Sequence, residues 1–272
     1  MKQKRAYWRN LDNAAKVFPA TSGEKDTRVF RFYCELKEEI KEEKLKQALD
    51  ETIETYPIFL SVMRKGLFWH YLEKSKLRPV VKEEYKEPCS NLYVRDKKAL
   101  LFEVTYFRKR INFEVFHALT DGTGATQFLR ELVKNYLYIC HGDEGLLKVE
   151  LLDEAVTVQD QEDDSFTKYY SKEKQSKVKK AKAFQLKKPR KEFGKLQISE
   201  RVISVKALLQ RSRELGVSMT MFLTAVYLMA IQQERSKIQM KRPIILMVPV
   251  NLRKFFPSES MLNFFNYIMI FR

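Results

Sequence analysis

Residues 111–124 read INFEVFHALTDGTG, and the spacing of their apolar side chains changes partway along. Apolar residues alternate over positions 111–115, which is typical of a strand with one face in the core, and His117 continues on that face. The pair Asp121-Gly122 is a turn signal, and an aspartate here is a suitable helix cap. A stripe of apolar residues three and four apart then predicts a helix. We therefore expect His117 to point inward at the carboxyl end of a strand, just before the chain turns into a helix.

Periodic stretches extend this pattern over the first half of the chain. Strands are expected at residues 28–36, 58–63, 67–72, 100–107 and 111–116. Apolar residues three and four apart predict a helix over residues 42–56, which Pro57 ends. Gly66, between two of the strands, is expected to take a positive φ in a hairpin. This order predicts an α/β (α+β) sandwich, with one helical layer on a mostly antiparallel sheet.

A charge-segregated stretch separates this half from the next. Residues 141–164 hold nine acidic side chains and one basic, whereas residues 168–195 hold twelve basic and two acidic. Such blocks are typical of a solvated linker. Beyond them we expect strands near 196–204 and 243–250, and helices at 205–215 and 218–233. The predicted domains are a first unit at 1–140, a linker or crossover at 141–195, and an incomplete second unit of similar type at 196–272.

The composition narrows the class of protein. The formal net charge of the 272 residues is +16, which favours anionic partners. Because the acidic and basic blocks adjoin, much of this charge is compensated locally, which disfavours the alternative of a nucleic-acid-binding protein. Three scattered cysteines favour reduced thiols and a cytoplasmic location. The apolar run at residues 219–231 is too short to span a bilayer, so we expect a buried helix there and no membrane insertion.

His117 is the candidate for acid–base chemistry. A partly buried imidazole four residues before a turn aspartate is a plausible general base. The alternative is a histidine that only satisfies hydrogen bonds near a strand end. His70 and His141 lack the spacing of a zinc site, so no metal is expected. The sequence also lacks a glycine-rich phosphate loop and a Gly-x-Ser-x-Gly nucleophile motif.

Three segments carry a family resemblance. Residues 116–122, FHALTDG, resemble the His-x-x-x-Asp-Gly signature of the chloramphenicol-acetyltransferase-like superfamily, which includes condensation domains and alcohol acetyltransferases. Residues 248–253, VPVNLR, and 263–265, NFF, are similar to segments of the second subdomain in these families. The layout is most similar to bacterial alcohol acetyltransferases. Two features depart from the pattern, because Phe116 stands where condensation domains usually have a first histidine and the chain stops partway through the second subdomain.

The resemblance implies an acyltransferase that moves an acyl group, acetyl in the simplest case, from acyl-coenzyme A to the hydroxyl of a small-molecule acceptor. His117 would be the general base, and Asp121, followed by Gly122, would be structural and held by Arg253. The alternative for Arg253 is a solvent-exposed position at a strand end. Asn263 would line the tunnel mouth or cap a turn. No permanently bound cofactor is implied, since acyl-coenzyme A is a co-substrate. The alternative function is a catalytically inactive, truncated homologue or binding module.

Overall fold

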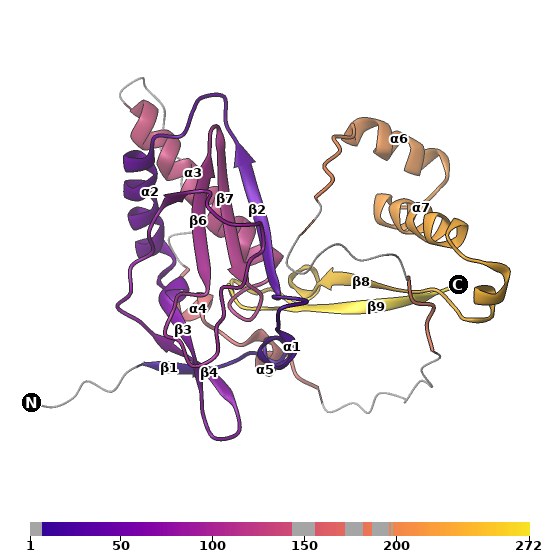
Figure 1. Ribbon diagram of the computed structural model, residues 1–272, viewed down its shortest axis with the longest axis horizontal. Coiled ribbons are helices and arrows are strands. Elements are labelled where there is room, and N and C mark those ends of the chain that lie inside the picture. The colour runs from indigo at the N-terminus through magenta and orange to yellow at the C-terminus, as the bar shows by residue number, and fades with distance from the viewer. Residues whose placement is uncertain (1–6, 143–155, 172–181, 187–195, 197) are drawn as a thin grey trace, which may run out of the picture. The chain divides into compact units, whose positions relative to one another are not determined.

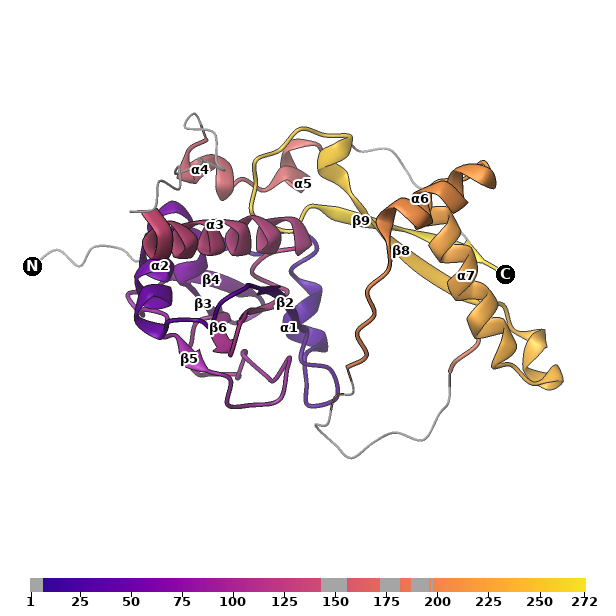
Figure 2. The same ribbon diagram turned by 90° about the horizontal axis from the view of Figure 1, so that it is seen from above.

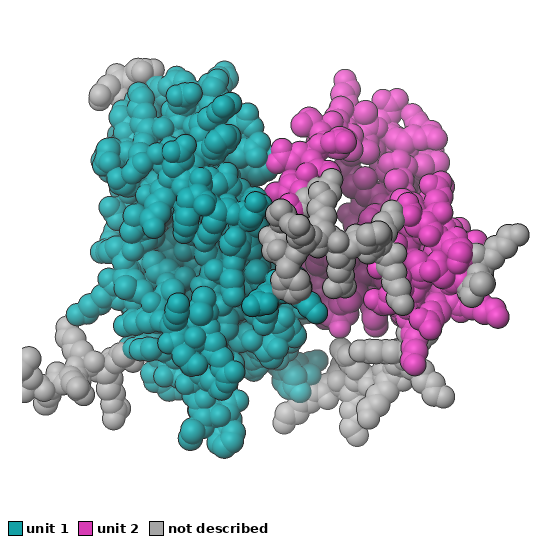
Figure 3. Space-filling view, viewed as in Figure 1, with its two compact units in different colours: residues 1–171, 193–195, 251–265 teal, residues 172–192, 196–250, 266–272 magenta. Residues whose placement is uncertain are grey.

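The computed structural model describes residues 7–142, 156–171, 182–186, 196 and 198–272. They belong to two compact units (Figure 3), which we describe separately. Unit 1 comprises residues 1–171, 193–195 and 251–265, and unit 2 comprises the remainder. Residues 251–265 therefore belong to unit 1, although the sequence assigned them to the second predicted domain.

A four-stranded sheet forms the centre of unit 1, in the order β2-β7-β6-β5. Its strands are β2 (Val29–Glu35), β7 (Arg110–Phe116), β6 (Phe102–Phe107) and β5 (Lys82–Glu83). All pairs are antiparallel except β5 with β6. A second, antiparallel sheet has the order β1-β4-β3, with β1 (Trp8–Asn10), β4 (His70–Lys74) and β3 (Ser61–Lys65). The predicted, mostly antiparallel architecture is confirmed.

Two helices form the helical layer on this sheet. They are α2 (Glu42–Thr55) and α3 (Gly122–His141), which pack side by side (Figures 1 and 2). The apolar stripe of α3 contributes Phe128, whose ring lies 4.6 Å from that of Phe113 on β7 and 4.3 Å from that of Phe59. All three side chains are fully buried, so aromatic packing between helix and sheet forms the core of unit 1.

Strand β7 is buried on both faces, whereas its alternation predicted only one. The second face carries Asn112 and Glu114, which are also buried. Glu114 Oε1 accepts hydrogen bonds from Arg31 Nε at 2.7 Å and Cys89 N at 2.6 Å. Glu114 thus occupies an interior face because its hydrogen-bond partners lie there too, which alternation alone does not reveal.

Two local predictions for unit 1 were wrong. Pro57–Leu60 form a short 3-10 helix, so β3 starts three residues later than expected. Gly66 does not take a positive φ. Its N–H donates to the Trp69 carbonyl at 2.7 Å, and a loop of this length turns without the left-handed residue that a two-residue hairpin needs. By contrast, the two-residue connection between β6 and β7 does contain a left-handed residue, Arg108, with φ 51°.

Unit 2 contains α6 (Val205–Glu214), α7 (Met219–Gln233) and most of β8 (Ile245–Asn251) and β9 (Phe265–Phe271). Gly216, with φ 66°, follows α6, and the Ser218 side chain caps α7. Residues 196 and 198–204 form no strand, contrary to prediction, and are exposed without a partner strand.

Helix α7 is also more exposed than the sequence indicated. Leu228 is its one buried residue, whereas Met221 and Met229 are more than half exposed. The expectation of a buried helix is therefore wrong, because the described residues of unit 2 leave most of the side chains of α7 uncovered. In the part of the chain that the structure describes, no single helix is long and apolar enough to cross a membrane. Helices α6 and α7 have that length and apolarity only when they are taken together, and they are bent by 87° relative to each other.

Candidate active site

His117 follows the last residue of β7, so the central strand of unit 1 positions it. The backbone N–H of His117 donates to the Arg28 carbonyl at 2.9 Å, which extends the pairing of β7 with β2 by one residue. Phe18, on α1 (Val17–Thr21), stacks on the imidazole at 4.4 Å, and Phe30 lies 4.8 Å from it. Burial lowers the pKa of His117 below its ordinary value, against smaller opposing effects of the Asn263 hydrogen bond and nearby backbone carbonyls.

Asn263 and Asp12 continue the site from the histidine ring. His117 Nδ1 lies 3.1 Å from Asn263 Oδ1. Asp12 Oδ2 accepts from Asn263 Nδ2 at 3.1 Å and from Asn263 N at 3.2 Å, and its other oxygen accepts from Ala15 N at 2.7 Å. Burial raises the pKa of the Asp12 carboxyl to about 6, although these hydrogen bonds and the charge of Arg9 oppose the rise. Asn263 thus contacts the imidazole itself, a position that neither sequence interpretation gave it.

Asp121 lies at the start of α3 and makes four contacts. Its Oδ1 accepts from the N–H groups of Thr123 and Gly124, at 3.0 and 3.1 Å, and so caps the helix. Its Oδ2 accepts from Arg253 Nη1 at 2.7 Å and from Phe264 N at 2.9 Å. Both carboxylate oxygens of Asp121 therefore accept hydrogen bonds from the protein itself, which fits a structural role.

Arg253 belongs to the segment 251–265 that returns to unit 1. Its side chain is only 10% exposed, and the guanidinium also donates to the carbonyls of Ser260 and Leu262. The arginine consequently holds both Asp121 and the loop that carries Asn263. The geometry does not fit the alternative of an arginine in solvent.

Gly122 and Gly124 differ in what surrounds them. Gly122 is the first residue of α3, and a Cβ there would have Phe32 as its nearest neighbour at 3.8 Å. A Cβ at Gly124 would clash with Thr120 Oγ1 and lie 2.6 Å from the Met261 carbonyl oxygen. The close approach of α3 to residues near Asn263 thus requires glycine at 124, a position that the motif interpretation left out.

Sequence reasoning missed three residues of the site, namely Asp12, Phe18 and Phe30. Each lies more than 80 positions before His117, in a segment without a recognisable catalytic motif. The one local signal is Asp12 three residues before Ala15, a spacing at which an aspartate commonly caps a helical turn. That signal predicts the bond to Ala15 and gives no indication of Asn263.

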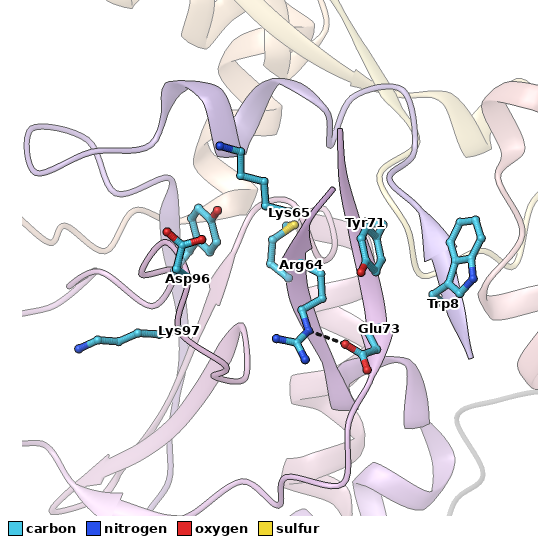
Figure 4. A pocket seen from close by; sticks show the side chains of 9 residues that line it. Trp8, Arg64, Lys65, Tyr71, Glu73, Asp96 and Lys97 are labelled. Atoms are coloured by element: carbon cyan, nitrogen blue, oxygen red, sulfur yellow. Dashed lines mark hydrogen bonds and ion pairs between the residues drawn. The ribbon is translucent and has the colours of Figure 1, made fainter. Parts of the chain in front are cut away.

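A separate cavity of about 450 Å³ lies beside β3, β4 and residues 93–97 (Figure 4). Tyr71 and Trp8 line it, and Arg64 pairs there with Glu73 at 2.5 Å. His117 is not among the residues that line this cavity, so we treat the cavity as separate from the candidate active site. Among the described residues, no group of three histidine, cysteine or acidic side chains is placed to hold a metal ion.

Comparison with known proteins gives structural matches only. No protein-family model and no curated protein matches the sequence. Polyketide synthase associated protein 5 from Mycobacterium tuberculosis matches with a TM-score of 0.60 and 17% identity, over 97% of this chain and 67% of its own. The first condensation domain of the calcium-dependent antibiotic synthetase gives 0.59 and 13%, over 98% and 69%. SgcC5 from Streptomyces globisporus gives 0.56 and 12%, over 97% and 68%. The chain therefore has the fold of the condensation-domain proteins, which is the fold that the His-x-x-x-Asp-Gly motif predicted.

Proposed function

We propose that this protein is an acyltransferase that moves an acyl group from acyl-coenzyme A to the hydroxyl of a small-molecule acceptor, with His117 as the general base. The observation that carries the proposal is the His117–Asn263 contact of 3.1 Å inside an aromatic enclosure. A neutral imidazole has one donor and one acceptor nitrogen. With Nδ1 donating to Asn263 Oδ1, Nε2 has the lone pair that a base needs.

The proposed reaction proceeds without a covalent enzyme intermediate. His117 Nε2 takes the proton from the acceptor hydroxyl while that oxygen attacks the thioester carbonyl. Collapse of the tetrahedral intermediate breaks the carbon–sulfur bond, and the departing thiolate of coenzyme A takes the proton back from Nε2. The lowered pKa of His117 supports this role, because the imidazole is then neutral at pH 7 and ready to accept a proton.

A ligand bound to one of the structural neighbours suggests a class of acceptor to test. SgcC5, which shares the fold, was solved in complex with (R)-(−)-1-(2-naphthyl)-1,2-ethanediol. A diol suits a site whose base acts on a hydroxyl, so aryl diols belong in the first panel of acceptors. Location in the cytoplasm, where acyl-coenzyme A is available, is part of the same proposal.

The test measures release of coenzyme A from acetyl-coenzyme A in the presence of simple alcohols and aryl diols. We expect wild-type turnover and a loss of about 10²–10⁴-fold in His117→Ala, the usual contribution of a general base. His141→Ala is the matched control, because His141 ends α3 about 30 Å from its start and should leave the rate unchanged. Full activity in His117→Ala would overturn the base assignment.

A calorimetric titration with acetyl-coenzyme A separates the proposal from the alternative of an inactive binding module. An acyltransferase both binds and turns over the thioester. Binding without turnover across the whole acceptor panel would support the binding module instead. Absence of both would contradict coenzyme A as the donor.

A further inference from the structure

We infer that Asp12 is a positioning residue that sets the tautomer of His117 through the side-chain amide of Asn263. The inference deepens the proposed function and rests on it for its kinetic consequence. Its structural part concerns only three side chains of unit 1, which lie far apart in the sequence and meet in a buried cluster.

The first step is the orientation of the Asn263 amide. An ionised carboxylate accepts hydrogen bonds and donates none. Asp12 Oδ2 lies within hydrogen-bond distance of both the backbone N–H and the side-chain nitrogen of Asn263. The amide NH₂ therefore faces Asp12, and the carbonyl oxygen of the amide has to face His117.

The second step is the protonation of the imidazole. Asn263 Oδ1 is an acceptor only, so His117 Nδ1 must carry the proton to make the 3.1 Å contact. A reversed amide would present its NH₂ group to Nδ1, which would then be the acceptor, and the proton would move to Nε2. In that tautomer Nε2 has no lone pair for an acceptor hydroxyl.

The surroundings of Asp12 indicate more than a capping role. Asp12 and Asn263 are 2% and 1% exposed, so both groups are removed from water. Capping Ala15 N needs a single acceptor, which asparagine or serine also supplies without burying a carboxylate. The second carboxylate oxygen is the one that both donors of Asn263 face. Its additional function is to fix which end of that amide meets His117.

Nitrogen-15 NMR of the imidazole rings tests the inference without any substrate. The chain has three histidines, and a His117→Ala spectrum assigns the signals of His117. At a pH above the pKa values of both His117 and Asp12, where the Asp12 carboxylate is ionised, we expect the Nδ1–H tautomer in the wild type and a substantial Nε2–H population in Asp12→Asn. The introduced asparagine has a single acceptor oxygen, so it cannot serve Ala15 and Asn263 together. A wild-type Nε2–H tautomer, or an unchanged Nδ1–H tautomer in Asp12→Asn, would overturn the inference.

Two further variants provide a second test and a control. Asn263→Ala removes the side-chain acceptor that faces Nδ1 and should also give mixed tautomers, which provides a second measurement if Asp12→Asn folds poorly. Glu131→Gln is the matched control, because Glu131 is a buried carboxylate of α3 that pairs with Lys134 at 2.5 Å. It should leave the tautomer of His117 as in the wild type.

Kinetics then connect the tautomer to the reaction. A misplaced proton reduces the fraction of active enzyme, so Asp12→Asn should lower kcat by about 10- to 100-fold with little change in KM, a smaller loss than the about 10²–10⁴-fold expected for removal of the base itself. A tautomer change in a protein without turnover would refute the proposed function and leave the role of Asp12 intact. Turnover by a protein whose tautomer is unchanged in Asp12→Asn would support the proposed function and refute the role of Asp12.

Discussion

At position 124 the first turn of α3 lies against the loop before Asn263. Thr120 Oγ1 donates to the Met261 carbonyl at 2.6 Å directly beside the Gly124 backbone. We predict that Gly124→Ala destabilises the protein by about 1–3 kcal/mol, as overpacking commonly does, because the added methyl group would lie 2.6 Å from the Met261 carbonyl oxygen. A thermal melt at neutral pH measures the loss.

Gly122→Ala provides the comparison for this prediction. The added methyl group would meet nothing closer than 3.8 Å, and alanine is a better helix former than glycine. Its melting temperature should equal or exceed that of the wild type. Equal melting temperatures for the two alanine variants would show that the approach of α3 to Met261 is looser than the structure indicates.

The Asp121–Arg253 pair joins two elements, the start of α3 and the segment 251–265. Both side chains are buried, at 6% and 10% exposure, so removing one partner leaves a charge uncompensated. We predict that Asp121→Asn lowers the free energy of unfolding by about 3–5 kcal/mol. The double variant with Arg253→Leu should recover part of this loss, because no buried charge then remains. Chemical denaturation of the four proteins measures the coupling.

Asp160→Asn controls for the loss of a helix cap. Asp160 belongs to the capping box of the short helix α4 (Val158–Gln161) and is exposed. Its substitution should destabilise the protein less than Asp121→Asn. Strictly additive effects of the Asp121 and Arg253 substitutions would show that the ion pair does not couple the two elements.

Individual elements of this fold could be predicted where local physics determines them. Periodicity located α2 and α3, the apolar run at residues 219–231 located α7, and the cap and stop signals at Asp121, Gly216 and Ser218 indicated three helix ends. The missing strand near residues 196–204 shows the limit of such patterns, since a β-prone sequence forms a strand only where a partner strand is present. The exposure of α7 has the same origin, because burial depends on neighbours that an apolar run does not identify.

At the scale of the whole chain, unit 1 is discontinuous. Unit 1 comprises residues 1–171, 193–195 and 251–265, so Arg253 and Asn263 reach the site through tertiary contacts. The family motifs indicated His117, Asp121, Arg253 and Asn263 as a set, and the structure brings them into two connected pairs. Asp12 could not be predicted in this way, because its contact with Asn263 spans 251 positions and no local pattern encodes it.

Because Asp12 is buried in the interior of unit 1, its titration should affect the stability of the whole protein. The pKa of Asp12 is about 6 in the folded protein against an ordinary value of 3.8, so the folded state holds more protons between these values. Stability from this group is complete below pH 3.8 and is lost as the pH rises through 6. Asp12→Asn lacks the titration, so the wild type should lose on the order of 2–3 kcal/mol relative to this variant between about pH 4 and pH 8. Denaturation curves across that range measure the difference, in which the titrations common to both proteins cancel. A difference that stays constant with pH would mean that Asp12 titrates alike in the folded and unfolded chains, and that burial does not raise its pKa.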